Sequence, residues 1–400
     1  MSAVLAALLL GATGCGAVAD PAAETAARDT SAGGTRLAED NGKFPTAVRL
    51  RHSGEADGTV LAATISFPAG VAPIYRSTDG GATFTEVSRI HDPSFATGLC
   101  CGSLLELPRQ VGDMAPGTLL WSASVGANGP DPDHPRPPDE PNDDRRMSTP
   151  VFRSDDHGLT WNRLEQPCAT AANKDGLWEP ELAVTDAGRL QCYFSYAEEN
   201  EDFAHSQRIV RTTFGDGTWS EPEDVVVLPE KDRRPGMPVV RRLPNGKSVM
   251  SYEICGRSGT HDCAAHLRTS PDGVDWGAET DRGTPVELDD GRFFAHAPKI
   301  AVIDDGTPDG LLVVVGQQLK NADGKTADGN GGTLLVGEHP GTAEFTASTA
   351  PVHVPSADGA SCGNYSSALV PLDEPSQILE IAADQDEGER CHAYFATGPL

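Results

Sequence analysis

The chain has 400 residues, of which 43 are glycine and 31 are proline, and this density of turn-forming residues excludes long helices. The balance of 31 Lys and Arg against 59 Asp and Glu gives a formal net charge of −28. Such a field repels nucleic acid and anionic membranes, so neither is expected as a partner.

The N-terminal residues are typical of an export signal. Val4–Leu10 is an apolar segment too short to span a bilayer, and small residues follow it up to Cys15. The segment Ala12–Cys15 resembles a bacterial lipobox, in which the cysteine is lipidated, although no Lys or Arg precedes the apolar run. We expect residues 1–15 to be a signal and lipobox-like segment and residues 16–41 to be a flexible tether. The protein is then exported, extracellular or held at the cell surface, and it meets a membrane only through the lipid.

A two-strand pattern recurs six times along the remaining chain. Each copy is a short apolar run, a turn containing Gly, Pro or Asp, and a second apolar run. The second runs are Val60–Ser66, Thr118–Ser124, Arg189–Tyr196, Ser248–Ile254, Leu311–Gly316 and Ile378–Ala383. A repeat of roughly sixty residues built from short strands predicts small antiparallel sheets that pack on their neighbours. The sequence therefore predicts an all-β fold, a six-bladed β-propeller of four-stranded antiparallel blades over residues 42–400.

A short turn motif supports this architecture. Ser77–Phe84 and Ser154–Trp161 both fit S-x-D-x-G-x-T-[WF], Ser270–Trp276 is shortened by one residue, and Gly215–Trp219 is a decayed copy. The pattern resembles the Asp-box of sialidase-like propellers. Its Ser and Asp side chains can bond nearby backbone amides while Gly takes a positive φ. We interpret these motifs as outer hairpin turns and not as catalytic residues.

The cysteines favour disulfides. Apart from Cys15 there are eight, an even number for an exported protein: Cys100, Cys101, Cys168, Cys192, Cys255, Cys263, Cys362 and Cys391. Cys255 with Cys263 would close a short loop, and Cys362 with Cys391 would tie the last repeat, whereas the other pairings do not follow from the sequence. A zinc site is the alternative, but no CxxC pair or HExxH motif is present. No metal and no cofactor is predicted, and no specific motif indicates a structural Ca²⁺.

The propeller topology predicts which residues share one rim. In an antiparallel pair, the start of the first strand lies beside the end of the second. The inner strands begin near Lys43, Cys101, Trp178, Arg234, His296 and Asn364, and the second strands end near Ser124, Tyr196, Glu253, Gln317 and Asp384. These positions should line the mouth of the ring.

Two glutamates stand out at this rim, because Glu179 opens the third repeat and Glu253 closes the hairpin of the fourth. Paired carboxylates suit glycoside hydrolysis, in which one attacks the anomeric carbon or orients water and the other protonates the leaving oxygen. Glu181 should share the strand face of Glu179, deeper in the channel. The remaining rim candidates for substrate binding are Trp178, Arg234, His296, Lys43, Tyr252 and Gln317. Each also has an ordinary structural role available, such as neutralising the glutamates for Arg234 or hydrogen bonding a neighbour for His296.

Several segments resemble the exo-α-1,5-L-arabinanases, or arabinobiohydrolases, which are six-bladed glycosidases of the sialidase superfamily. They are Gly176–Leu182 with its Trp-Glu-Pro, Arg234–Val239, Met250–Glu253 and Cys362–Leu369, and the likeness runs from about Phe44 to the C-terminus. The resemblance implies a retaining mechanism in which Glu179 and Glu253 are the catalytic pair and Tyr365 assists beside the nucleophile. It does not decide which glutamate attacks. We favour Glu253 as nucleophile and Glu179 as acid/base.

Two other functions stay open. An exo-α-sialidase clamps its substrate carboxylate with three arginines, but here only Arg234 holds a blade-start position, while Arg51 or Arg257 in flanking loops could substitute. A non-catalytic carbohydrate- or protein-binding propeller is the second, with the Pro- and Asp-rich residues 128–146 as a lip or partner loop. We expect a monomeric exo-acting glycosidase for oligo- or polysaccharides with α-linked neutral sugars, such as α-1,5-L-arabinan.

Overall fold

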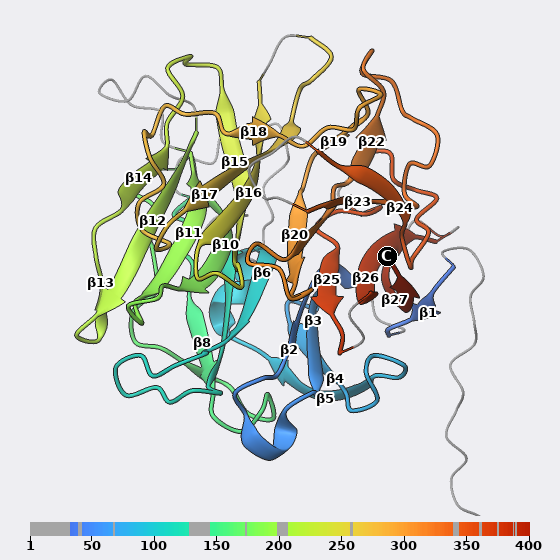
Figure 1. Cartoon of the computed structure of the whole chain (residues 1–400). Helices are drawn as coiled ribbons and strands as arrows, with labels where there is room; N and C mark the ends of the chain where they lie inside the picture. Colours follow the sequence, from blue (N-terminus) through green and yellow to red (C-terminus); the bar gives the residue numbers. More distant parts are fainter. Residues whose placement is uncertain are drawn as a thin grey trace, which may run out of the picture.

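Six antiparallel sheets stand in a ring around a central channel (Figure 1). The computed structural model describes residues 33–38, 42–66, 69–127, 145–172, 174–197, 207–256, 259–338, 344–359, 362–373, 376–386, 388 and 390–400. The predicted six-bladed propeller is confirmed. The expected signal segment, the lipidation site Cys15 and residues 128–144 of the insert lie outside the described residues.

The strands follow each other outward from the channel within each blade. Blade 1 has β2 (Gly42–Arg49), β3 (Val60–Ser66), β4 (Ala72–Ser77) and β5 (Thr85–Ile90). Blade 2 has β6 (Leu99–Glu106), β7 (Leu119–Val125), β8 (Val151–Ser154) and β9 (Asn162–Arg163). Blade 3 has β10 (Leu177–Val184), β11 (Leu190–Tyr196), β12 (Arg208–Gly215), β13 (Thr218–Trp219) and β14 (Glu223–Val226).

The second half of the ring repeats this order. Blade 4 has β15 (Arg234–Arg242), β16 (Ser248–Cys255), β17 (Ala264–Ser270) and β18 (Thr284–Pro285), and its sheet continues into β19 (Phe293–Ala295) and β22 (Gln318–Lys320). Blade 5 has β20 (Lys299–Ile303), β21 (Leu311–Val315), β23 (Thr333–Gly337) and β24 (Thr346–Thr349). Blade 6 has β25 (Ala368–Pro371), β26 (Gln377–Gln385), β27 (Cys391–Pro399) and β1 (Thr35–Arg36). Helix in the described residues is limited to the 3-10 turns η1 (Gly54–Ala56) and η2 (Pro93–Thr97).

The ring is closed by an N-terminal strand. Thr35 and Arg36, which we expected in the flexible tether, pair as β1 with Phe395 and Tyr394 of β27. The pairing covers the outer edge of the last blade, where unpaired backbone N–H and C=O groups would otherwise be exposed. The boundary of the propeller at residue 42 was therefore placed too late in the chain.

The innermost strands share an irregularity near their start. Phe44, Cys101, Glu179 and Met237 all have positive φ, and the register of β2, β6, β10 and β15 shifts around them. Such β-bulges re-aim side chains and recur beside active sites. Each of the first four blades thus turns one side chain at its rim away from the regular alternation of the strand.

The predicted hairpin turns make the expected hydrogen bonds. Asp79 accepts from the backbone N–H of Thr83 at 3.0 Å, and Ser77 Oγ accepts from the N–H of Gly81 at 2.8 Å. Asp156 and Ser154 repeat the arrangement between β8 and β9. Because these turns lie between outer strands, they stabilise the edges of blades 1 and 2 and are far along the sheet from the innermost strands.

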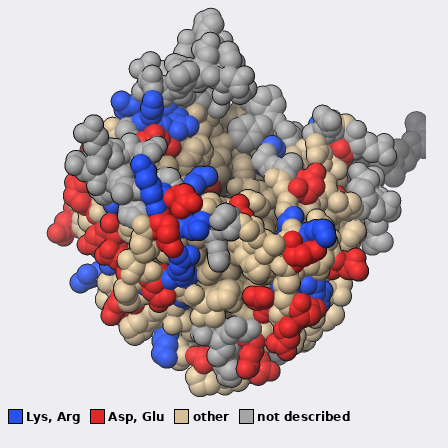
Figure 2. All heavy atoms as spheres, turned by 90° about the horizontal axis from the view of Figure 1, so that it is seen from above, with Lys and Arg blue, Asp and Glu red and all other residues tan. Residues whose placement is uncertain are grey.

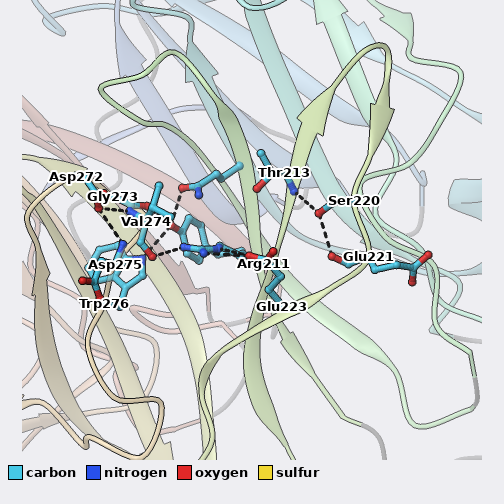
Figure 3. A network of polar contacts seen from close by, with 12 residues as sticks. Arg211, Thr213, Ser220, Glu221, Glu223, Asp272, Gly273, Val274, Asp275 and Trp276 are labelled. Atoms are coloured by element: carbon cyan, nitrogen blue, oxygen red, sulfur yellow. Dashed lines mark hydrogen bonds and ion pairs between the residues drawn. The ribbon is translucent and has the colours of Figure 1, made fainter.

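The third turn also joins two blades, as the close view shows (Figure 3). Asp272 accepts the N–H groups of Val274 and Asp275, each at 2.8 Å. Arg211 of β12 donates to the carbonyl oxygen of Val274 and pairs with Glu223 of the same blade. The motif therefore links the outer part of blade 4 to blade 3.

All eight cysteines of the propeller are paired. The predicted disulfides Cys255–Cys263 and Cys362–Cys391 are present, and the other two are Cys168–Cys192 and the adjacent pair Cys100–Cys101. The expected disulfides are therefore present in the described residues.

No helix among the described residues has the length and hydropathy of a membrane span.

Glu380 gives a test of how burial controls stability. Its side chain is 1% exposed on β26, and burial raises its pKa from 4.5 to about 8 although the N–H of Val352 donates to it at 2.9 Å. Because the folded pKa is above the unfolded one, the protein loses stability as the pH rises from about 4.5 to 8. We expect Glu380→Gln to raise the free energy of unfolding at pH 9 by on the order of 3 kcal/mol and to change it little at pH 4.5.

Denaturant unfolding of both proteins at the two pH values measures this difference. Glu86→Gln on the outer strand β5 is the matched control, because Glu86 is partly exposed and paired with Arg89. Equal stability differences at pH 4.5 and pH 9 would contradict the assignment of the effect to Glu380.

Candidate active site

A hollow opens near the middle of the ring when it is seen from above (Figure 2). Acidic side chains cover much of the outer edge of this face, and basic side chains also lie beside the hollow. The ends of the second strands and the bulges of the innermost strands meet at one rim, because each hairpin pairs antiparallel.

Glu179 lies on the bulge of β10, with φ of 54°. Ser195 of β11 donates its hydroxyl to Glu179 Oε2 at 2.7 Å and accepts the backbone N–H of Met237 at 2.9 Å. Burial raises the pKa of Glu179, while the Ser195 hydroxyl and the charges of Lys299 and Arg234 act in the opposite direction. Burial is the largest of these influences, so the pKa of Glu179 is raised, and the Ser195 hydroxyl and the two cations limit the rise.

Glu253 lies near the end of β16 and is 9% exposed. Its Oε2 accepts the backbone N–H of Ala297 at 2.8 Å, and His296 Nδ1 lies 3.9 Å away. Burial and then the charge of Glu179 raise the pKa of Glu253 to about 8, although the Ala297 N–H and the charge of Arg234 oppose them. Glu253 pairs with Gly236 across the hairpin of blade 4, and the next residue, Met237, donates to the Ser195 hydroxyl that binds Glu179, so adjacent blades bring the two glutamates together.

Tyr365 joins the same group from the last blade. Its hydroxyl lies 3.7 Å from Met237 Sδ, and its ring packs edge-on against Phe44 at 5.5 Å between centroids. Burial and the charges of Glu179 and Glu253 raise its pKa, so the phenol stays protonated. The three residues that the resemblance singled out therefore share one site.

Two cations act on this site. Arg234 is exposed, donates to Gln207 Oε1 at 3.0 Å, and its charge stabilises the ionised forms of both glutamates and Tyr365. Lys299, at the start of β20, was missed by the sequence analysis. Burial lowers its pKa, and the charges of Glu181 and Glu179 counteract this. Lys299 follows the rim residue Ala297 by two positions, just as Glu181 follows Glu179. This shared spacing in the sequence indicates that Lys299 faces the channel below the rim.

Glu181 lies deeper in the channel, as expected. It is 4% exposed and forms an ion pair with Arg241, and it also accepts from Ser103 Oγ and the Val240 N–H, each at 3.3 Å. These contacts join innermost strands of blades 2, 3 and 4. Glu181 therefore fixes the strands beneath the rim and has no place in direct substrate contact.

Two substrate-binding predictions are wrong. Tyr252 has no exposed surface, because alternation along β16 turns it away from the mouth that Glu253 faces, and its hydroxyl donates to the carbonyl oxygen of Arg282 at 2.7 Å. Gln317 is 1% exposed and donates to the carbonyl oxygen of Gly363 at 3.2 Å, so it links the ends of blades 5 and 6.

The other predicted binding residues lie at the rim. Trp178 is half-buried and the Arg145 guanidinium lies 5.6 Å above its ring, so the ring is not a bare stacking platform. His296 retains 40% side-chain exposure, and burial lowers its pKa. Lys43 is half-buried on β2 opposite Ile65.

The flanking arginines do not supply a sialidase-like clamp among the described residues. Arg51 lines a cavity of about 390 Å³ that also takes in the later residues of the innermost strands, such as Val184 and Arg242 at the ends of β10 and β15. This cavity lies away from the rim at which Glu179 and Glu253 meet, because those two residues belong to the opposite ends of their hairpins. The other candidate, Arg257, lies outside the described residues.

Known structures share the fold of this chain. No family model and no curated protein matches the chain. The α-L-arabinanase of Penicillium chrysogenum, solved with arabinobiose, is 25% identical, with a TM-score of 0.69 over 90% of this chain and 93% of that one. The chain is similar to the α-L-arabinanases.

Two further structures show how far the likeness extends. The GH93 α-L-arabinofuranosidase of Fusarium graminearum, also solved with arabinobiose, is 23% identical, with a TM-score of 0.69 over 92% of this chain and 97% of that one. A leech intramolecular trans-sialidase shares the fold at 12% identity, with a TM-score of 0.54 over 92% of this chain and 70% of that one. The predicted resemblance to arabinanase-like glycoside hydrolases is confirmed, and these neighbours agree with the predicted enzyme class.

Proposed function

We propose that the chain is an exo-acting, retaining glycoside hydrolase for α-linked neutral sugars, with α-1,5-L-arabinan as the leading substrate. The observation that carries this proposal is the convergence of Glu179 and Glu253 with Tyr365 at the open rim of the propeller. The arabinobiose bound in two of the similar structures supports arabino-oligosaccharides as the substrate class.

The surroundings of the two glutamates favour different protonation states. Burial raises the pKa of Glu179 as well, but the hydrogen bond from Ser195 and the charges of Lys299 and Arg234 stabilise its carboxylate. Glu253, with its pKa raised to about 8, holds a proton at neutral pH. Two titratable groups whose environments separate them in this way are suited to opposite roles. We therefore assign Glu179 as nucleophile and Glu253 as acid/base, the reverse of the assignment that the sequence favoured.

The reaction then proceeds in two balanced steps. Glu253 gives its proton to the glycosidic oxygen while the Glu179 carboxylate bonds to the anomeric carbon and the leaving alcohol departs. Glu253, now ionised, takes a proton from a water molecule, and this water displaces Glu179 from the anomeric carbon. Both carboxyl groups return to their starting states, and the two inversions leave the configuration of the sugar unchanged.

Tyr365 is the third member of the site. Sialidases use a tyrosine as the nucleophile, so the role of this residue differs between the two candidate functions. Here burial and the two neighbouring glutamates raise the pKa of Tyr365, so its hydroxyl remains a neutral donor beside the pair. We assign it to hydrogen bonding within the site.

Hydrolysis should depend on the proton of Glu253. We expect kcat/KM to fall about tenfold for each pH unit above about 8, because only the protonated carboxyl can serve as general acid. A pH profile of the initial rate of sugar release, with the enzyme returned to pH 7 to verify its integrity, measures this. Constant kcat/KM up to pH 10 would contradict the assignment.

The function itself is tested by product release from linear α-1,5-arabinan beside a fluorogenic sialoside. Arabinobiose release that disappears in Glu179→Gln is expected. Sialic acid release would favour the sialidase alternative. Binding of arabino-oligosaccharide without turnover would favour a non-catalytic binding propeller.

The cellular context is proposed on chemical grounds. Four disulfides suit an oxidising compartment outside the cytoplasm. We propose that the protein is exported, anchored through Cys15 and active as a monomer. Metabolic labelling with a radioactive fatty acid, lost in Cys15→Ser, and light scattering of the purified protein test these points.

A further inference from the structure

Glu253 has an unusual set of neighbours outside the proposed reaction. Cys255, Cys263 and His296 surround it, and one ligand atom from each of the four residues lies within 4.8 Å of all the others. Cys255 Sγ is 3.3 Å from Glu253 Oε1, and His296 Nδ1 is 3.9 Å from Oε2. Within the described part of the chain, this is the one such group of three or more His, Cys, Asp or Glu residues.

Apart from the two bonded sulfurs, the separations from Glu253 are close to those of a tetrahedral metal site. Zinc lies about 2.3 Å from sulfur and about 2.0–2.2 Å from nitrogen or oxygen, so adjacent ligands stand roughly 3.3 to 3.8 Å apart. A set of two thiolates, one imidazole and one carboxylate suits Zn²⁺ and other borderline or soft divalent ions. In the structure the two sulfurs are joined as the Cys255–Cys263 disulfide, which removes them as thiolate ligands.

The backbone holds the four residues together without the disulfide. The N–H of Cys263 donates to the carbonyl oxygen of Ile254 at 3.0 Å, and the N–H of His296 donates to the carbonyl oxygen of Cys263 at 3.0 Å. Ala297 N–H binds Glu253 directly. Opening the disulfide therefore leaves the ligands beside one another and frees the sulfurs to separate to the distance that a metal ion requires.

We propose that reduction of the Cys255–Cys263 disulfide creates a site for a divalent ion such as Zn²⁺ on Cys255, Cys263, His296 and Glu253, and that the bound ion blocks catalysis. A dithiol reductant supplies two electrons and two protons, becomes a disulfide itself, and leaves two thiols on the protein. Binding of Zn²⁺ releases both thiol protons to water. The inhibition rests on the proposed role of Glu253, whereas the metal site does not.

Co²⁺ gives a readout of the site that is independent of activity. The protein is treated with a phosphine reductant, which becomes a phosphine oxide, and is then titrated with Co²⁺ under exclusion of air. We expect a thiolate-to-cobalt absorption band that saturates at one equivalent and is displaced by Zn²⁺. The oxidised protein should show none. Hydrolysis by the reduced enzyme should fall at least tenfold on saturation with Zn²⁺ and recover when a chelator is added.

Two double variants assign the band. Cys255→Ser/Cys263→Ser should lose it, whereas Cys362→Ser/Cys391→Ser, which removes the disulfide of the last blade, should keep it. His296→Ala should weaken Co²⁺ affinity at least tenfold. A band that persists in Cys255→Ser/Cys263→Ser, or a disulfide that the phosphine does not open in the folded protein, would overturn the proposal. A saturable band with no substrate hydrolysed would support the site and contradict only the proposed function.

Discussion

Replacing Glu179 with glutamine is expected to lower kcat on arabino-oligosaccharides by about 10⁴- to 10⁶-fold, the range found when a nucleophile is removed. Glutamine keeps a carbonyl oxygen that can accept the Ser195 hydroxyl, so the hydrogen bond to β11 and the link to Met237 survive. The loss then reports the missing carboxylate and not a collapsed rim. Initial rates with purified variants, and a thermal unfolding curve for each, measure this.

The stereochemistry of azide rescue decides which glutamate attacks. In Glu179→Ala, azide should react directly at the anomeric carbon and give the β-glycosyl azide from an α-linked substrate. If Glu253 is the nucleophile instead, Glu179→Ala with azide should give the α-glycosyl azide, because azide then meets a glycosyl-enzyme that is already inverted. Proton NMR of the azide product distinguishes the two outcomes.

Glu253→Gln should slow hydrolysis of natural substrates by about 10²- to 10⁴-fold, the usual contribution of a general acid. The loss in kcat/KM should be much smaller for a dinitrophenyl glycoside, because kcat/KM reports the first step and this leaving group departs without protonation. The fall in kcat/KM above pH 8 should also disappear with this substrate, since that limb belongs to Glu253.

The comparison of an aryl glycoside with an arabino-oligosaccharide measures the effect, with Glu86→Gln on β5 as the control for a glutamate far from the rim. Equal losses in kcat/KM on both substrates would show that Glu253 is not the acid that protonates the leaving group. The roles of the two glutamates would then have to be exchanged.

The local pattern predicted the elements that depend on neighbouring residues. Val60–Ser66 is expected as a second strand and is β3 with the same bounds, because the run is apolar except at Thr64 and Ser66 and begins just after a turn glycine. Gly58 takes φ of 88° there, as a turn of this kind requires. The meeting of Glu179 and Glu253 followed from the antiparallel rule and the order of the blades alone.

The wrong predictions concern residues whose exposure depends on the packing of neighbouring blades. Tyr252 was grouped with Glu253 because it is adjacent in sequence, yet adjacent residues of a strand face opposite sides, and the tyrosine packs between blades. Gln317 was placed at the rim correctly but is covered by the neighbouring blade. The sequence analysis selected rim segments mainly by their carboxylates. The segment before Lys299 has none, so this lysine was not selected.

Pairing between distant segments was also beyond the sequence. Nothing in Thr35 and Arg36 identifies a strand, because two residues carry no periodicity. Likewise, the Cys100–Cys101 pair is not implied by an even cysteine count. The strand pairing of Thr35 and Arg36 and the Cys100–Cys101 disulfide both depend on contacts that exist only in the folded protein.

The pairing of β1 with β27 determines the order in which the molecule can assemble. Blades 1 to 5 are built from contiguous chain and can each form as soon as their own strands are available, whereas the last blade recruits Thr35 to Phe395 across nearly the whole sequence. Bringing residues so far apart in the sequence together costs much chain entropy before the pairing stabilises the fold. The pairing of β1 with β27 is therefore expected late in folding. Until then the outer edge of the last blade has no partner strand. The blade that brings Tyr365 beside Glu179 and Glu253 is thus the last to be completed during folding.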